Sequence, residues 1–170
     1  MFELQIVGPE HSDQLVKLWV ETYRQAYEDV HSSKNIAAYC EANFTLESAS
    51  VELSNPQTAC CIGSRGSDPR GFYVVKHHSC PIPVDSESSE LKQIYVLAKE
   101  YGTGLGRLLY EHAIECVRAA GSNWVWLSVS DINYRAQAFY QKLGFEQLGP
   151  GPLFEVGSER LTSSIMAYKF

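Results

Sequence analysis

The stretch "EYGTGLGRLLYEH", residues 100–112, places three glycines within five positions, directly before a leucine-rich segment with helical periodicity. Backbone N–H groups in the first turn of a helix lack partners within the helix, and the helix dipole is positive at that end. Because Gly102, Gly104 and Gly106 have no Cβ, an anionic oxygen could approach this backbone closely. The stretch therefore predicts an anion-binding turn that starts a helix. The alternative is a loop that needs glycine only for its turn geometry.

Three phosphate-binding motifs can be compared with this turn. A Walker loop requires Gly-Lys-Ser/Thr, whereas Gly106 is followed by Arg107. A dinucleotide-binding GxGxxG motif that starts at Gly102 would need glycine or alanine at position 107, and it normally opens the first βα turn of a parallel sheet. The pattern [Q/R]xxGxG/A fits with its two glycines at Gly104 and Gly106, although Tyr101 stands where glutamine or arginine is usual. This third pattern describes the turn best.

Apolar periodicity and turn residues predict the elements around the glycines. The predicted strands are residues 2–7, 58–64, 71–77, 90–97 and 124–130, with weaker strands at 145–148 and 163–170. The predicted helices are residues 12–30, 33–44, 46–53, the segment from the glycines to residue 120, and residues 133–144. This order predicts a mixed α+β fold, in which strand 90–97, the helix after the glycines and strand 124–130 form a parallel βαβ unit.

Size and charge limit the classes of function. A chain of 170 residues is expected to form a single domain, residues 1–170, around one core. No stretch approaches the ~20 apolar residues that cross a bilayer, and residues 1–15 lack the features of a targeting segment. These observations predict a cytoplasmic protein with no membrane partner. The net charge of −6 argues against non-specific binding of nucleic acid.

Cysteine and histidine usage argues against metal and disulfide chemistry. The five cysteines form an odd set without CxxC spacing, which predicts reduced thiols rather than disulfides or a structural zinc site. The five histidines show no ligand spacing, so no metal site is expected. The cysteines are Cys40, Cys60, Cys61, Cys80 and Cys116.

A second motif lies downstream of the glycines. The segment "NYRAQAFYQKLGF", residues 133–145, has the form N-x-x-A-x-x-F-Y-x-x-x-G-F. With the strand "LKQIYVL" and the glycine turn, it resembles the GNAT superfamily of N-acetyltransferases over residues 90–145, in the order and at the spacing of that family. Residues 21–45 are similar to the corresponding part of bacterial small-molecule members near the polyamine acetyltransferases. The resemblance implies a GNAT-like fold: a central, mostly antiparallel twisted sheet of six to seven strands, helices on both faces, and a splayed parallel strand pair.

The resemblance also implies acetyl-CoA as co-substrate and a primary amine of a small molecule as acceptor. The backbone of residues 94–96 would pair with the pantetheine arm, and the backbone of residues 102–107 would hold the pyrophosphate. The residues implied to bind acetyl-CoA are Ile94, Tyr95, Val96, Gly102, Thr103, Gly104, Leu105, Gly106, Arg107, Asn133 and Tyr140. Asn133 is also suited to cap its helix. Because Tyr101 departs from the motif, Arg107 or Lys99 is expected to supply the missing phosphate contact.

Tyr140 is the predicted general acid. A phenol with a pKa near ~10 stays protonated at neutral pH and can deliver a proton to the departing CoA thiolate. The alternative is that Tyr140 belongs to an apolar core stripe with Phe139 beside it.

Glu90 is the candidate general base, since an alkyl amine with a pKa near ~10.4 is almost entirely protonated at pH 7. Strand alternation predicts that Glu90 shares one side of its strand with residues 92, 94 and 96. The alternatives are a solvated carboxylate at a strand end, and a base that acts through ordered water. Glu100, beside the glycines, is expected to be solvated.

Two other functions remain open at this point. One is a non-catalytic sensor that binds acyl-CoA, and the other is an N-acetyltransferase of proteins or peptides. The acceptor pocket is expected among the helices before residue 44 and the loop 77–89. The sequence does not identify the acceptor amine, and it leaves a homodimer open.

Overall fold

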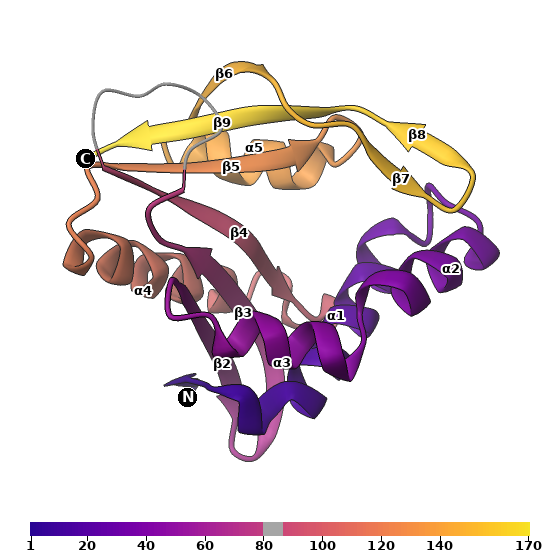
Figure 1. Cartoon of the computed structure of the whole chain (residues 1–170), viewed down its shortest axis with the longest axis horizontal. Coiled ribbons are helices and arrows are strands. Elements are labelled where there is room, and N and C mark those ends of the chain that lie inside the picture. Colours follow the sequence, from indigo (N-terminus) through magenta and orange to yellow (C-terminus); the bar gives the residue numbers. More distant parts are fainter. Residues whose placement is uncertain (80–86) are drawn as a thin grey trace.

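Seven strands of the described residues form one sheet, in the order β1-β2-β3-β4-β5-β9-β6 (Figure 1). All neighbouring strands are antiparallel except β4 and β5. The computed structural model describes residues 1–79 and 87–170, so Cys80 and residues 80–86 of the loop predicted to line the acceptor pocket lie outside the described residues. The strands of this sheet are β1 (Glu3–Ile6), β2 (Thr58–Arg65), β3 (Asp68–Lys76), β4 (Ser88–Val96), β5 (Trp124–Ser130), β6 (Glu146–Pro150) and β9 (Ser163–Lys169). The sheet confirms the predicted fold class.

Helices cover both faces of this sheet, as predicted. They are α1 (Ser12–Tyr27), α2 (Ser33–Asn43), α3 (Leu46–Ser54), α4 (Leu105–Ala119) and α5 (Tyr134–Lys142), with short 3-10 helices at Pro9–His11 and Ala98–Glu100. Side chains cap the starts of α2 and α3: the Ser32 hydroxyl accepts from the Asn35 N–H at 3.2 Å, and Thr45 forms a reciprocal capping box with Ser48. Both caps satisfy donors that the first turn leaves free.

Two cores hold the helices to the sheet. On one face, α4 presents Leu105, Leu109 and Val117, all fully buried, at spacings of four and eight residues. This stripe packs in one cluster with Ile94 of β4 and with residues of α5. On the other face, α1 and α3 pack in a separate cluster that contains Leu15. The sheet is therefore a middle layer, and the helices after β4 lie on the opposite face from α1 and α3.

The parallel pair β4–β5 diverges after three residues. Its register runs from Ser88↔Trp124 to Glu90↔Trp126 and then stops, although both strands continue. This is the splayed parallel pair that was expected.

A β-bulge in β4 lies where the two strands part. Val75 pairs with Leu91 while Val74 pairs with Gln93, which leaves Lys92 as the extra residue. The bulge shifts the alternation by one residue, so Leu91 and Ile94 pack in the same core. Glu90 therefore faces away from Ile94 and Val96, and the prediction that they share one side is wrong.

A short hairpin beside α2 was not predicted. Strands β7 (Phe154–Val156) and β8 (Glu159–Leu161) pair antiparallel and reach from the sheet towards α2 (Figure 1). Val156 is fully buried in a cluster with Tyr23, Tyr27, Ile36 and Cys40 of the first two helices. Strands of three residues carry too little periodicity to be detected in a sequence, so tertiary packing alone defines this hairpin.

Candidate active site

The glycine turn leaves a cluster of backbone donors free at the start of α4. Gly102 and Gly104 have φ values of +79° and +92°, which non-glycine residues rarely adopt. Gly104 is the N-cap, and the first bond of the helical ladder runs from the Leu108 N–H to the Gly104 carbonyl at 3.0 Å. The three N–H groups between them have no acceptor in that ladder. Apart from the adjoining backbone, no atom of the described residues lies within 4 Å of a Cβ built on Gly102, Gly104 or Gly106, so these donors border open space that suits an anionic group.

Two neighbours fix the shape of this turn. Thr103 directs both its N–H and its hydroxyl to the Glu100 carbonyl, at 3.2 and 2.8 Å. The Glu100 side chain is buried and lies 3.5 Å from an Arg65 nitrogen and 3.8 Å from an Arg70 nitrogen. The expectation that Glu100 is solvated is therefore wrong, because its side chain is buried and its carboxylate lies near two guanidinium groups.

A cavity of about 70 Å³ lies where β4 and β5 diverge. It is lined by Tyr27, Leu91, Lys92, Gln93, Ile94, Tyr95, Ser128, Val129, Ser130, Asn133, Ala136 and Tyr140. The structure thus brings together four of the predicted site residues, Ile94, Tyr95, Asn133 and Tyr140. Glu90 and Val96 do not belong to the described lining.

Tyr140 belongs both to the core and to this cavity. Its side chain is 8% exposed, and its ring centroid lies 5.5 Å from that of Phe139 and 5.6 Å from that of Phe145. Burial raises the pKa of the Tyr140 phenol, and the nearby Tyr27 and Tyr110 add to this effect. Burial likewise raises the pKa of Tyr95, helped by the Tyr27 hydroxyl. The phenol of Tyr140 is therefore held in its protonated form.

Polar side chains in the same cavity were partly missed. Asn133 caps α5, since its Oδ1 accepts from the Ala136 N–H at 3.0 Å. Gln93 accepts from the Trp19 indole N–H at 2.8 Å, which links β4 to α1. The buried Ser130 hydroxyl has no partner within the described part of the chain. Strand alternation predicts that the Ser128 side chain lies on the opposite face of β5 from Leu127 and Val129. Ser128 and Ser130 line a cavity only because β5 diverges from β4, which the sequence of β5 does not indicate.

Glu90 lies outside the cavity, on the face of β4 that α3 covers. It pairs in register with Lys76 and is half-buried. Burial raises the pKa of the Glu90 carboxyl, while Lys92 and Lys76 act in the opposite direction. Lys92 itself forms an ion pair with Glu52 of α3. The carboxylate is thus neither freely solvated nor next to the predicted acid.

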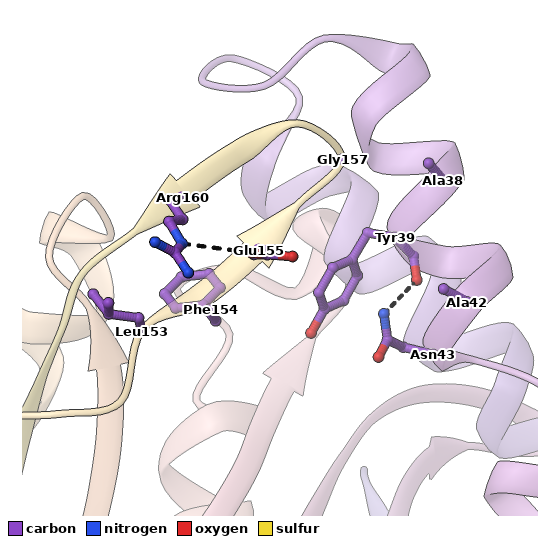
Figure 2. A pocket seen from close by; sticks show the side chains of 9 residues that line it. All are labelled: Ala38, Tyr39, Ala42, Asn43, Leu153, Phe154, Glu155, Gly157 and Arg160. Carbon is purple, nitrogen blue, oxygen red and sulfur yellow. Dashed lines mark hydrogen bonds and ion pairs between the residues drawn. The ribbon is translucent and has the colours of Figure 1, made fainter.

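A larger cavity of about 550 Å³ opens between α2 and the β7–β8 hairpin (Figure 2). Tyr39 and Asn43 of α2 form one wall. Figure 2 shows Glu155 and Arg160 on the opposite wall, 3.5 Å apart, with the ring of Tyr39 facing the hairpin. The hairpin wall was missed because the hairpin itself was not predicted.

Aromatic rings connect the two cavities. The Tyr39 ring stacks on that of Tyr23 at 4.4 Å, and Tyr23 lies 4.7 Å from Tyr27, which lines the cavity beside Tyr140. The buried Tyr23 hydroxyl has no hydrogen-bond partner among residues 1–79 and 87–170.

The described ranges were also searched for other kinds of site. They contain no helix that is long and apolar enough to span a bilayer. In the same ranges, no three His, Cys, Asp or Glu side chains converge as metal ligands would. The four cysteines outside residues 80–86 are free thiols, as expected.

Comparisons with known proteins agree with this geometry. The model of the acetyltransferase (GNAT) family matches residues 13–145. An uncharacterised N-acetyltransferase of Mycobacterium tuberculosis is 26% identical over 155 residues, 91% of this chain and 95% of that protein. Streptothricin acetyltransferase of Streptomyces lavendulae is 28% identical over 103 residues, 61% of this chain and 51% of that protein.

The fold is similar to that of PaiA N-acetyltransferase from Thermoplasma acidophilum, whose crystal structure was determined in complex with coenzyme A. The two structures superpose with a TM-score of 0.83 at 20% identity, over 100% of this chain and 99% of the other. The family match covers the strands that diverge, the glycine turn and Tyr140, and it shows that this chain belongs to the GNAT family of N-acetyltransferases, acyltransferases that depend on acetyl-CoA.

Proposed function

We propose that the protein transfers the acetyl group of acetyl-CoA directly to a primary amine of a small molecule, without a metal ion. The observation that carries this proposal is the position of Tyr140. Its phenol lines the cavity between the diverging strands, together with Ile94 and Asn133. An acid in that wall can act on a group that lies between the strands, which is what acyl transfer from a thioester requires.

The residues around the cavity suit acetyl-CoA, which supplies an activated acetyl thioester when bound. The open space beside Gly102, Gly104 and Gly106, with free N–H groups at the start of α4, fits a diphosphate. The backbone of Ile94, Tyr95 and Val96 has no partner from β5 because the register ends at Glu90, so its polar groups can pair with the amides of the pantetheine arm. An N–H of this edge can also stabilise negative charge on the acetyl oxygen.

Proton transfer is assigned to two groups. Tyr140 holds its proton because burial raises its pKa, and it donates this proton to the leaving sulfur. Glu90, whose pKa is raised by burial towards the range of a useful base, accepts a proton from the acceptor amine. Because Glu90 lies outside the cavity lining, it acts through ordered water.

The larger cavity is the proposed acceptor site. Its volume of about 550 Å³ falls within the ~300–1,000 Å³ that is usual for small-molecule sites. The Glu155 carboxylate on its wall suits an ammonium group, and the Tyr39 ring can contact a cation. A relative that is named for a small-molecule acceptor, streptothricin acetyltransferase, supports the same class of substrate.

The test is an amine panel that follows release of the CoA thiol, with acetyl-CoA as donor. The panel contains polyamines, amino acids, aminoglycosides and short peptides, and we expect turnover of at least one small amine. Thermal stabilisation by CoA without turnover of any amine would support the acyl-CoA sensor instead. Turnover confined to peptides would support a protein N-acetyltransferase.

A further inference from the structure

The glycine turn lacks the side chain that its motif places before the glycines. Tyr101 stands where glutamine or arginine is usual, so one polar contact to a phosphate has to come from elsewhere. The two cations that were expected to replace it already have partners. Arg107 donates to Glu111 at 2.8 Å along α4, and the Lys99 ammonium lies 3.9 Å from Asp68.

A third cation reaches the turn from another helix. The guanidinium carbon of Arg135, in the first turn of α5, lies 3.4 Å from the centroid of the Tyr101 ring. The ring attracts the cation through its face, which leaves the N–H groups at the edge of the guanidinium plane available. No carboxylate lies within ion-pair distance of Arg135 in the part of the chain that the structure describes. Arg135 is therefore a positioned cation without an anion.

We propose that Arg135, held on the Tyr101 ring, binds the diphosphate of acetyl-CoA and replaces the side chain that the motif lacks at position 101. The proposal rests on the diphosphate lying at the glycine turn, as in the proposed function. A planar guanidinium suits a phosphate because it can donate two parallel hydrogen bonds, and the ring limits the orientations of an otherwise exposed side chain. Arg135 is thus a CoA-binding residue, and Tyr101 is its positioning residue.

The test measures the dissociation constant of coenzyme A by titration calorimetry, so it requires no known acceptor. We expect Arg135→Ala to weaken binding about tenfold, because it removes a charge-assisted contact to phosphate. Arg135→Lys recovers part of the loss. The matched control is Arg118→Ala, in the last turn of α4, which removes an arginine that also lies over an aromatic ring, 4.7 Å from the Phe170 centroid, and is expected to change the constant less than twofold. Melting temperatures establish that each variant is folded.

A series of ligands shows which group Arg135 contacts. The loss in Arg135→Ala should persist with 3′-dephospho-CoA and disappear with pantetheine, measured by competition. A loss that already disappears with 3′-dephospho-CoA would place Arg135 at the 3′-phosphate and overturn the proposal.

Exchange of side chains at position 101 tests the pairing itself. Tyr101→Ala should reproduce part of the loss, and Tyr101→Arg in the Arg135→Ala background should restore binding to within about threefold of the wild type. Unchanged affinity of Arg135→Ala for coenzyme A, in a protein whose wild type binds, overturns the role of Arg135 alone. A wild type that does not bind coenzyme A overturns the placement of the diphosphate as well.

Discussion

Tyr140 belongs to the apolar core and also lines the cavity of the diverging strands. Its ring packs with Phe139 and Phe145, while the same residue lines the cavity with Asn133. Tyr140 can therefore be a core residue and a proton donor at the same time. A substitution that keeps the ring and removes only the hydroxyl separates the packing role from proton donation.

Tyr140→Phe should lower kcat about 10²-fold and leave the KM for acetyl-CoA nearly unchanged, because a proton donor acts mainly on the chemical step. The measurement is steady-state kinetics with an amine from the panel. Tyr110→Phe is the matched control, since Tyr110 is equally exposed at 8%, packs in the same core and should keep its kcat. Wild-type turnover by Tyr140→Phe, under conditions in which chemistry is rate-limiting, would exclude the acid role.

The half-buried Glu90 predicts a pH-dependent effect on stability. Its pKa is raised in the folded state, so ionisation favours the unfolded state and stability decreases as pH rises from about 4.5 through the raised value. Glu90→Gln cannot ionise. Its melting temperature should therefore exceed that of the wild type at pH 7 and approach it at pH 4. Glu146→Gln, at an exposed position of β6, is the control, and a destabilised Glu90→Gln at pH 7 would contradict the argument.

Single residues show how far the sequence determines the candidate site. Residue-by-residue comparison with the family motif selected Asn133, Tyr140 and Ile94, and the structure places them around one cavity. The side of the strand that Glu90 faces was mispredicted, since a bulge at Lys92 depends on pairing with β3 and has no local signal. The burial of Glu100 was missed for a similar reason, because Arg65 and Arg70 are distant in sequence.

At the scale of elements, the start of α4 combines two kinds of glycine. Gly104 has a φ of +92°, whereas Gly106 lies within the helix, and neither has an atom within 4 Å of a built Cβ. Gly104→Ala should therefore cost about 1–2 kcal/mol of stability through backbone strain. Gly106→Ala should stabilise the free protein by about 0.5–1 kcal/mol, because alanine favours the helix.

Both substitutions should nevertheless weaken binding of coenzyme A, since each new methyl group enters the space beside the free N–H groups. Thermal unfolding with and without coenzyme A measures the two effects together. If Gly104→Ala lowers stability and Gly106→Ala raises it, while both weaken binding of coenzyme A, the glycines are needed for the ligand as well as for the turn. Wild-type affinity in Gly106→Ala would show that the diphosphate does not approach this backbone.

Elements also differ in how well a sequence predicts them. In the described residues, the five α-helices were located within a few residues, because an amphipathic helix repeats its apolar pattern over successive turns. The hairpin of β7 and β8 has three residues in each strand, and its position depends on the burial of Val156 beneath α1 and α2. Because contacts with distant residues define this hairpin, its own sequence contains no clear strand pattern.

At the scale of the whole molecule, the hairpin forms a wall of the proposed acceptor site and lies away from the glycine turn. Val156→Ala should destabilise the protein by about 2 kcal/mol through lost burial and a small cavity. It should also raise the KM for the amine several-fold while leaving the KM for acetyl-CoA nearly unchanged, because the hairpin lines the proposed acceptor cavity and contributes no residue to the lining of the cavity between the diverging strands. Steady-state kinetics with each substrate varied in turn measures this.

Val117→Ala is the matched control for that prediction. Val117 is also fully buried, but it lies in α4 against the other core. Val117→Ala should cause a similar loss of stability, without a selective rise in the KM for the amine. Equal effects of the two substitutions on both KM values would show that the hairpin has no special relation to the acceptor.

The sheet can also be viewed as two halves, β1–β4 and β5–β9–β6, that touch along three residue pairs at one end. Beyond that contact, each half presents an edge whose peptide groups receive nothing from the other. An extended molecule with peptide-like amides at intervals could complete both edges at once, as an additional strand would. Such a ligand would form the backbone hydrogen bonds that β4 and β5 do not make with each other in this gap, so the gap would favour ligands with peptide-like amides over ligands without them.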